Sequence, residues 1–121
     1  MKYLVVDDSK IARKMTIKNL KLLITDNCEI VEASNGQEAI DLYKEHEPAI
    51  CFMDLTMPIV NGFEATKEIC DLNNEAKVII VSADIQEIAM QKAKENGAIG
   101  FIKKPINKDN LESMLKTLEL I

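Results

Sequence analysis

The 121-residue sequence predicts an α/β fold, a doubly wound parallel sheet of five strands with five helices on its two faces. Five short apolar stretches alternate with five longer stretches of helical periodicity. The central stretch, residues 49–53, is apolar without interruption, as is typical of a strand buried on both faces of a parallel sheet. Polar residues follow the strands at their carboxyl ends, the edge at which open α/β sheets bind ligands.

The first strand and the helix after it come from the start of the chain. Residues 3–6 form the strand, which ends at Asp7 and Asp8, and Ser9 is the natural N-cap of the helix. One side of this helix collects Ile11, Ala12, Met15, Asn19 and Leu22 or Leu23.

The second strand covers residues 28–33. Asn35 caps the helix that follows it, with Glu38 at the third helical position, and Pro48 marks the end of that helix. The side chains that we expect to face inward from the helix are Ala39, Ile40 and Tyr43.

The third strand is the apolar stretch that runs into Asp54. Pro58 closes it, because proline has no backbone N–H to donate to a sheet. A cap at Asn61 starts the third helix, which runs to about Asn73.

The last two strand–helix pairs follow the same plan. The fourth strand (77–81) precedes a helix over residues 85–96 that stops at Gly97, a favourable residue for a helix C-terminus. The fifth strand (99–102) precedes a helix whose apolar face is formed by Leu111, Met114, Leu115 and Leu118.

The composition narrows the class of protein. A net charge of −5 without a Lys/Arg cluster argues against nucleic-acid binding, and the lack of an 18-residue apolar run argues against a membrane span. Three widely spaced cysteines fit neither a disulfide framework nor a zinc site, so we expect free thiols in a reducing cytoplasm. We expect one domain over residues 1–121, a cytoplasmic monomer with no output domain.

Charged side chains meet at the carboxyl edge of the predicted sheet. The residues that directly follow the predicted strands include Asp7, Asp8, Asp54, Ser82 and residues 103–104. At least three carboxylates, a hydroxyl and an ammonium therefore converge at this edge. Carboxylates this close repel one another, and a bound cation relieves the repulsion. Ligands that are all oxygens favour Mg²⁺, with Mn²⁺ as an alternative. Together these groups suit phosphoryl transfer to a carboxylate.

The order and spacing of four motifs resemble the receiver domains of two-component response regulators, in particular the single-domain, CheY-like kind. The resemblance covers essentially the whole chain and implies a flavodoxin-like sheet of strand order 2-1-3-4-5. The motifs are residues 5–9 (VVDDS), 53–58 (MDLTMP) with Gly62, 81–83 (VSA) and 97–105 (GAIGFIKKP).

The resemblance implies a role for each residue of the site. Asp54 would be the phosphoacceptor and would bind Mg²⁺ together with Asp8 and the backbone carbonyl of Thr56. Asp7 would act through water or by holding the site together. Lys104 would contact the phosphoryl group.

The same resemblance implies a switch. A phosphoryl oxygen would draw the Ser82 hydroxyl inward, and Phe101 would move into the space left behind. The surface of the fourth helix, fifth strand and fifth helix would then change for a target protein. The bond before Pro105 is expected to be cis. The Thr56 and Asp84 side chains would tune phosphate hydrolysis, although Asp84 also fits a simple cap of the fourth helix.

Each of these residues, taken alone, also fits a structural role. Asp7 and Asp8 fit a charge pair at a helix start, Ser82 a turn, Phe101 the core and Lys104 the solvated surface. Their combination is what favours the functional interpretation.

The implied function is that of a stand-alone response regulator, not an enzyme. A histidine kinase would donate the phosphoryl group, and the phosphorylated protein would bind a target, in the manner of chemotaxis signalling. One alternative is a phosphorelay intermediate that passes the group to a histidine phosphotransfer protein. Another is a Mg²⁺-dependent phosphohydrolase, but Thr56 stands where such enzymes commonly place a second acid.

Overall fold

The computed structural model describes residues 1–24, 27–55, 57, 59–83 and 86–121. Within them, strands and helices alternate along the chain. The strands are β1 (Lys2–Val6), β2 (Glu29–Ala33), β3 (Ile50–Met53), β4 (Val78–Ser82) and β5 (Gly100–Lys103). The helices are α1 (Lys10–Leu23), α2 (Gly36–His46), α3 (Gly62–Leu72), α4 (Glu87–Glu95) and α5 (Lys108–Thr117).

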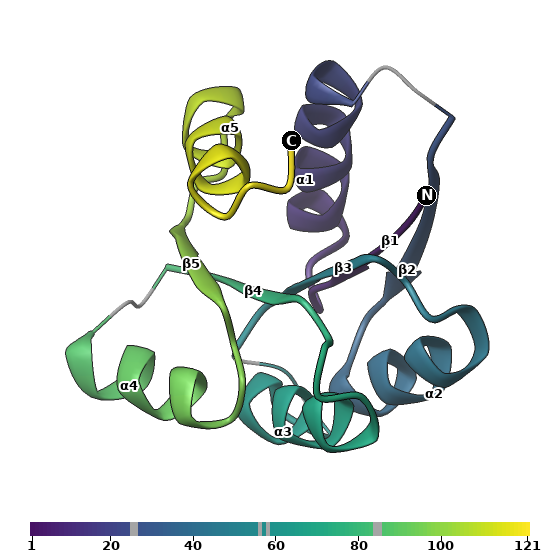
Figure 1. The fold of residues 1–121 in the computed structure, drawn as a ribbon, viewed down its shortest axis with the longest axis vertical. Coiled ribbons are helices and arrows are strands. Elements are labelled where there is room, and N and C mark those ends of the chain that lie inside the picture. Colours follow the sequence, from purple (N-terminus) through teal and green to yellow (C-terminus); the bar gives the residue numbers. More distant parts are fainter. Residues whose placement is uncertain (25–26, 56, 58, 84–85) are drawn as a thin grey trace.

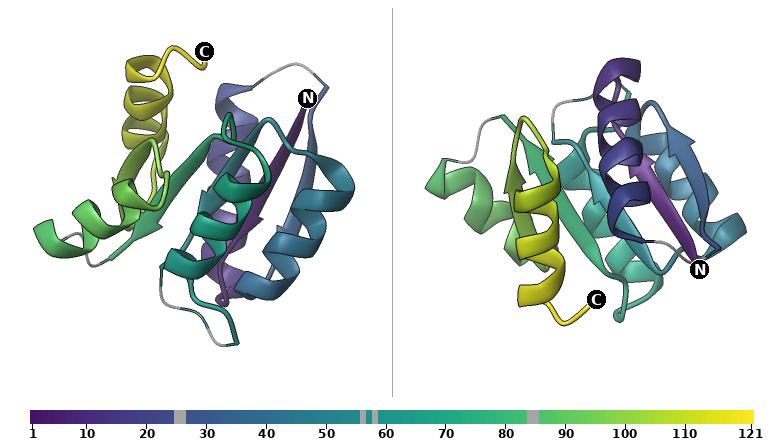
Figure 2. Two further views of the ribbon diagram at one scale, coloured as in Figure 1. Left: turned by 60° about the horizontal axis from the view of Figure 1, so that its bottom comes forward. Right: turned by 90° about the horizontal axis from the view of Figure 1, so that it is seen from above.

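The strands form one parallel sheet in the order β2-β1-β3-β4-β5. Helices α1 and α5 cover one face of the sheet, and α2, α3 and α4 cover the other (Figure 1). The turned views show the same three layers (Figure 2). The predicted fold class and strand order are therefore confirmed. Among the described helices, none combines the length and hydropathy that a bilayer span requires.

Successive side chains of the central strands pack into the two helical layers in turn. On β1, Tyr3 and Val5 join the cluster under α1 and α5, whereas Leu4 joins the cluster under α2, α3 and α4. On β3, Phe52 and Met53 point to opposite layers and are 1% and 0% exposed. Burying a side chain of this size contributes roughly 2–3 kcal/mol. Burial on both faces explains why the third strand is an unbroken apolar run.

The three polar caps that the sequence predicts are present, at the starts of α1, α2 and α3. The side chains of Ser9, Asn35 and Asn61 each accept a hydrogen bond from a backbone N–H three residues later, at 3.2, 2.9 and 3.0 Å. Glu38 behaves differently from a capping-box residue. Its carboxylate accepts hydrogen bonds from the Ser34 backbone N–H (2.7 Å) and hydroxyl (2.6 Å). Glu38 therefore ties the loop after β2 to the start of α2.

Helix α4 is attached to the rest of the molecule by few side chains. It begins slightly later than predicted, and its N-cap residue Gln86 makes no side-chain cap bond. Ala93 is the buried residue of this helix. The ammonium of Lys92 lies 4.6 Å from the ring centroid of Phe63 on α3, a cation–π contact across the two helices. The predicted capping residue Asp84 lies outside the described residues.

Helix α1 is oriented differently from what its sequence pattern suggests. Ile11, Met15 and Leu22, which share one side in the sequence analysis, are 79%, 42% and 56% exposed. The reason is that α1 is apolar on more than one side, so that periodicity alone does not choose the buried one. The side chains that α1 buries are Thr16, Ile17 and Leu20.

The loop after β3 is packed closely against its neighbours. The Gly36 N–H donates to the Val60 carbonyl at 2.9 Å, which joins this loop to the start of α2. A Cβ atom at Gly62 would collide with the backbone carbonyl oxygen of Asp54. Ile59 has a φ of 68°, in the left-handed region that a β-branched residue rarely adopts. Gly62 therefore packs directly against the Asp54 backbone, and Ile59 is a strained residue among those described in this loop.

Candidate functional site

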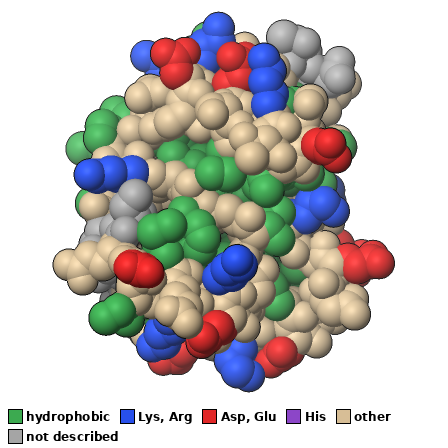
Figure 3. Space-filling view, turned by 60° about the vertical axis from the view of Figure 1, so that its left-hand side comes forward, with side chains coloured by type: hydrophobic (Ala, Val, Ile, Leu, Met, Phe, Trp, Pro, Cys, Tyr) green, Lys and Arg blue, Asp and Glu red, His purple; other side chains and the backbone are tan. Residues whose placement is uncertain are grey.

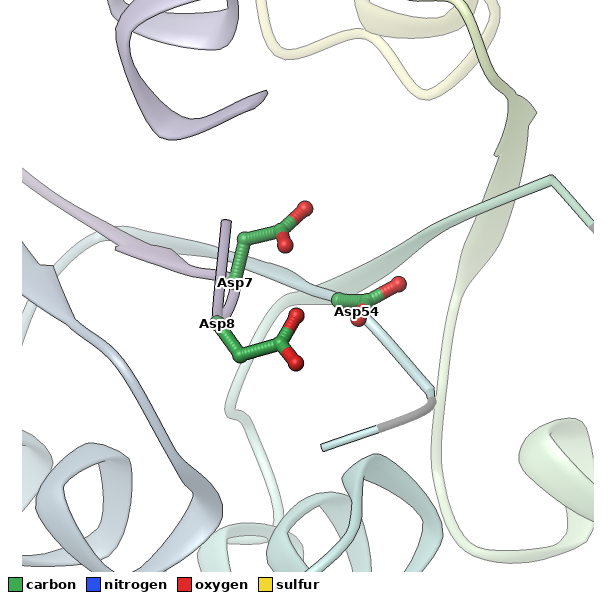
Figure 4. Close-up of side chains that lie close together, drawn as sticks. All are labelled: Asp7, Asp8 and Asp54. Carbon is green, nitrogen blue, oxygen red and sulfur yellow. The ribbon is translucent and has the colours of Figure 1, made fainter. Parts of the chain in front are cut away.

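Three aspartates lie together where two central strands end. Asp7 and Asp8 follow β1, and Asp54 follows β3, the neighbouring strand. The Asp54 N–H donates to the Val6 carbonyl at 3.0 Å and so extends the pairing of the two strands into the site. One oxygen of each carboxylate lies within 4.8 Å of the others. The carboxylates point from the strand ends toward a shared space (Figure 4). Asp7 and Asp54 are buried, whereas Asp8 is exposed.

Lys104 brings a positive charge into this acidic cluster. Its Nζ lies 2.6 Å from the Oδ2 of Asp7 and 3.3 Å from the Oδ1 of Asp54. The backbone N–H of Lys104 donates to the Ser82 carbonyl at 2.9 Å, which continues the pairing of β4 with β5. The ammonium therefore bridges two of the three carboxylates, and the end of the sheet holds its backbone.

The buried charges change the acidity of the site. Burial raises the pKa of Asp54 to about 6, the negative charge of Asp7 adds to this effect, and Lys104 opposes it. For Lys104, burial alone would lower the pKa, but the hydrogen bond to Asp7 and the charges of both aspartates outweigh it and raise the pKa. Lys104 thus compensates the negative charge of Asp54 only in part.

Arg13 supports the acidic loop, and the sequence analysis did not identify it. Its Nη1 donates to the backbone carbonyl of Asp7 at 2.7 Å, and its Nε donates to Glu32 on β2 at 3.0 Å. The Ser9 N–H also binds the Oδ1 of Asp7 at 2.9 Å. The only sequence signal for Arg13 is its place one turn after Ser9, from which a long side chain can reach back to the strand end.

The two predicted switch residues lie on neighbouring strands. Ser82 is the last residue of β4 and is buried. Phe101 is on β5 and pairs in register with Ile80, two residues before Ser82. It is partly buried and packs against the core cluster on the α2–α4 side of the sheet. Both residues thus lie on the β4–β5 half of the sheet, and Phe101 packs against the core cluster to which Ala93 of α4 also belongs.

The turn after β5 carries Lys104 and is held from α5. The bond between Lys104 and Pro105 is cis. The side chain of Asn110, in the first turn of α5, donates hydrogen bonds to the carbonyls of Pro105 (3.1 Å) and Lys103 (3.4 Å). Sequence analysis missed this contact as well. The predicted roles of Thr56 and Asp84 fall on residues outside the described part of the chain.

The donor set of the cluster fits a hard divalent cation. Asp7, Asp8 and Asp54 offer only oxygen atoms, and burial together with the negative charge of Asp7 raises the pKa of Asp54. Because Asp8 is exposed, a cation there would keep water ligands, as Mg²⁺ usually does. The described residues therefore suit Mg²⁺ better than zinc, which prefers nitrogen and sulfur.

The fold and this arrangement of acids and lysine define the class of the protein. The chain belongs to the response regulator receiver domain family, which it matches over residues 3–116.

Within this family, the chain is CheY-like. It is 42% identical to the chemotaxis protein CheY of Bacillus subtilis over 117 residues, 95% of each chain. It is 40% identical to CheY of Halobacterium salinarum over 109 residues, covering 89% of this chain and 88% of that protein.

Solved structures agree with the sequence comparison. CheY4 of Vibrio cholerae superposes with a TM-score of 0.83 at 28% identity, covering 99% of this chain and 97% of that one. A CheX–CheY–BeF₃–Mg²⁺ complex from Borrelia burgdorferi gives a TM-score of 0.84 at 29% identity, covering 98% of this chain and 89% of that one.

Proposed function

We propose that this protein is a cytoplasmic, stand-alone response regulator that a histidine kinase phosphorylates on Asp54 in a Mg²⁺-dependent reaction. The observation that carries the proposal is the setting of Asp54. It is a buried carboxylate with a raised pKa, beside two further aspartates and the ammonium of Lys104. A carboxylate in such a site is a nucleophile whose charge needs compensation, and a metal with a phosphoryl group supplies a partner for it.

The chemistry follows from the positions of these groups. An oxygen of Asp54 forms the new bond to phosphorus while the bond from phosphorus to the donor's histidine nitrogen breaks, and the imidazole keeps the electron pair. Bound Mg²⁺ would neutralise charge on the phosphoryl oxygens, held by Asp8, Asp54 and the Thr56 carbonyl, with Asp7 acting through water. Lys104 already lies 3.3 Å from Asp54, so its ammonium is within reach of a group attached there.

The product is a signal rather than a released compound, so we class the protein as a phosphoacceptor and not an enzyme. The phosphoryl group would bind the Ser82 hydroxyl and favour the inward position of Phe101. Moving such an equilibrium from mostly inactive to mostly active takes about 5 kcal/mol of differential affinity. Helix α4, whose buried residue is Ala93, is the element that can move at least cost.

The face formed by α4, β5 and α5 would bind the target protein. Hydrophobic side chains gather at the centre of this face, with charged side chains around them (Figure 3). A groove of about 460 Å³ lies between α4 and β5, lined by Met90 and Phe101 among others. Because Phe101 belongs both to the switch and to this groove, a change in its position changes the surface that a target meets.

A second groove, beside Lys104, offers a place for the phosphodonor. It has a volume of about 360 Å³, and its walls include Ile11 and Met15 of α1 and Ile106 after β5. Helix α1 carries five Lys and Arg residues and no acidic residue, in a chain of net charge −5. We therefore expect the donor to present an amphipathic helix with acidic residues.

Charge reversal tests this docking site. Lys18→Glu, on the exposed side of α1, should slow phosphorylation by the cognate kinase severalfold and should not change phosphorylation by a small-molecule donor. Lys77→Glu makes the same change at the start of β4, far from the groove, and serves as the control. Equal kinase rates for the two variants would count against α1 as the donor site.

The phosphorylation proposal is tested with Mg²⁺ and beryllofluoride, a stable analogue of the phosphoryl group. Wild-type protein should show changed amide NMR signals around Ser82 and Phe101, and Asp54→Asn should show none. Radiolabelled phosphodonor should label the wild type alone. Label uptake by Asp54→Asn equal to that of the wild type would overturn the proposal. Transfer of label from Asp54 to a histidine phosphotransfer protein, faster than its loss to water, would indicate the phosphorelay alternative.

A further inference from the structure

The side chain of Asn110 joins helix α5 to the turn that carries Lys104. Its Nδ2 donates to the carbonyls of Pro105 (3.1 Å) and Lys103 (3.4 Å), the residues on either side of Lys104. Its Oδ1 accepts the Asn107 N–H at 2.8 Å, and its own N–H donates to the Asn107 Oδ1 at 2.8 Å. Asn110 thus does more than complete the capping box of α5.

The chemistry of these contacts fixes the orientation of the amide. Two carbonyl oxygens face one end of the Asn110 side chain, and only an NH₂ group can donate to both. A backbone N–H faces the other end and needs an oxygen acceptor. Asparagine satisfies both requirements at once. Aspartate of the same shape satisfies only the second, because it has no donor.

Lys104 is consequently held from two sides. Its backbone N–H donates to the Ser82 carbonyl at 2.9 Å, and the carbonyls before and after it are bound by Asn110. The Lys104 side chain is long, and its ammonium lies near two different acids, at 2.6 Å from Asp7 and 3.3 Å from Asp54. A shift of the backbone at its base would move the ammonium away from Asp54.

We propose that Asn110 is a positioning residue for Lys104, which sets the ammonium where it can meet a phosphoryl group on Asp54. This inference rests on the proposed function. It also assigns α5 a direct part in the site: the first turn of the helix that forms part of the target-binding face holds the backbone of the phosphate-contacting lysine.

Two substitutions with the same charge change separate positioning from capping. Asn110→Asp keeps the Oδ1 acceptor but replaces the donor with an oxygen that repels both carbonyls. Asn107→Asp keeps the N-cap acceptor, adds the same charge in the same turn, and has no contact with residues 103 and 105 in the described hydrogen bonds. Both variants should fold, because a negative charge at a helix N-terminus is favourable.

The readouts are the dissociation constants for Mg²⁺ alone and for beryllofluoride at saturating Mg²⁺, with thermal unfolding as the check on folding. Asn110→Asp should weaken beryllofluoride binding roughly fivefold or more, the effect of losing one hydrogen bond of ordinary strength. Its Mg²⁺ affinity should match that of Asn107→Asp. The lysine ammonium NMR signal of Lys104 should also shift or broaden in Asn110→Asp only.

The outcomes distinguish this inference from the proposed function. If the wild type does not bind beryllofluoride with Mg²⁺, the proposed function fails and the inference fails with it. If the wild type binds and the two variants bind equally well, the positioning role is overturned and the proposed function stands. Should Asn110→Asp not fold, Asn110→Ser, which also lacks the amide donors, decides the question by the same comparison with Asn107→Asp.

Discussion

Asp54→Asn should stabilise the metal-free protein, although it removes the residue on which the proposed function depends. The pKa of Asp54 is raised from 3.8 to about 6, mainly by burial. At about 1.4 kcal/mol per pH unit, the ionised carboxylate costs the folded state about 3 kcal/mol. Asparagine has nearly the same shape and no charge, so it removes this cost. The gain is reduced because Lys104 loses one of its two acidic partners.

The sign of the pH dependence follows from the raised pKa. The folded protein holds the Asp54 proton more tightly than the unfolded chain does, so the penalty is fully present above pH 6. It declines as the pH falls from about 6 to 3.8 and disappears below that range. The advantage of Asp54→Asn over the wild type should therefore be about 1–3 kcal/mol at pH 7.5 and close to zero near pH 4.

Urea unfolding with EDTA at pH 7.5 and pH 4 measures this difference in the free energy of unfolding. In thermal unfolding, 1 kcal/mol corresponds to roughly 4 °C in the melting temperature of a domain of this size. Adding Mg²⁺ should stabilise the wild type more than the variant and so shrink the difference at pH 7.5. Asp41→Asn, an exposed acid on α2, controls for the loss of one negative charge. An Asp54→Asn protein less stable than the wild type at pH 7.5 without metal would refute the electrostatic argument.

Three further predictions concern the loop after β3 and the lysine. Gly62→Ala should destabilise the protein by roughly 2 kcal/mol or more in urea unfolding, because the new Cβ meets the Asp54 carbonyl oxygen. Ile59→Asn should stabilise it by about 1 kcal/mol, since asparagine tolerates a φ of 68° and Ile59 is 79% exposed; an unchanged midpoint would show that no strain is stored there. Lys104→Ala should tighten Mg²⁺ binding severalfold in calorimetric titration and weaken beryllofluoride binding, because the ammonium neutralises Asp7 and Asp54 until a cation replaces it. Weaker Mg²⁺ binding by this variant would contradict the idea that Lys104 and Mg²⁺ compete for the same carboxylates.

The sequence was sufficient to predict the sheet and the gathering of the acids, for a topological reason. Parallel strands all end at one edge, so Asp7, Asp8 and Asp54 had to come together once the strands were recognised. The unbroken apolar run before Asp54 identified the central strand, since only burial on both faces calls for it. These inferences need the positions of residues along the chain and no knowledge of side-chain conformation.

The side of α1 that faces the sheet was not predictable in the same way. The apolar residues of this helix are spread over more than one of its sides. Ile17 and Leu20 are buried in the core, whereas Ile11 and Met15 are exposed. Hydrophobic periodicity ranks residues by their preference for burial, but two sides of similar preference can be separated only by the shape of what they pack against. The side left exposed is the one that lines the groove beside Lys104.

The supporting contacts were beyond sequence reasoning for a different reason. Arg13 and Asn110 act through backbone carbonyls, of Asp7 in one case and of Lys103 and Pro105 in the other. Every residue carries a backbone carbonyl, so the residue type does not reveal which carbonyl accepts the hydrogen bond. An arginine or asparagine near the start of a helix is also too common to indicate such a contact. Such contacts depend on the relative placement of helix and turn to within about 0.5 Å. The residues that react can be recognised by type, whereas those that position them become visible only in three dimensions.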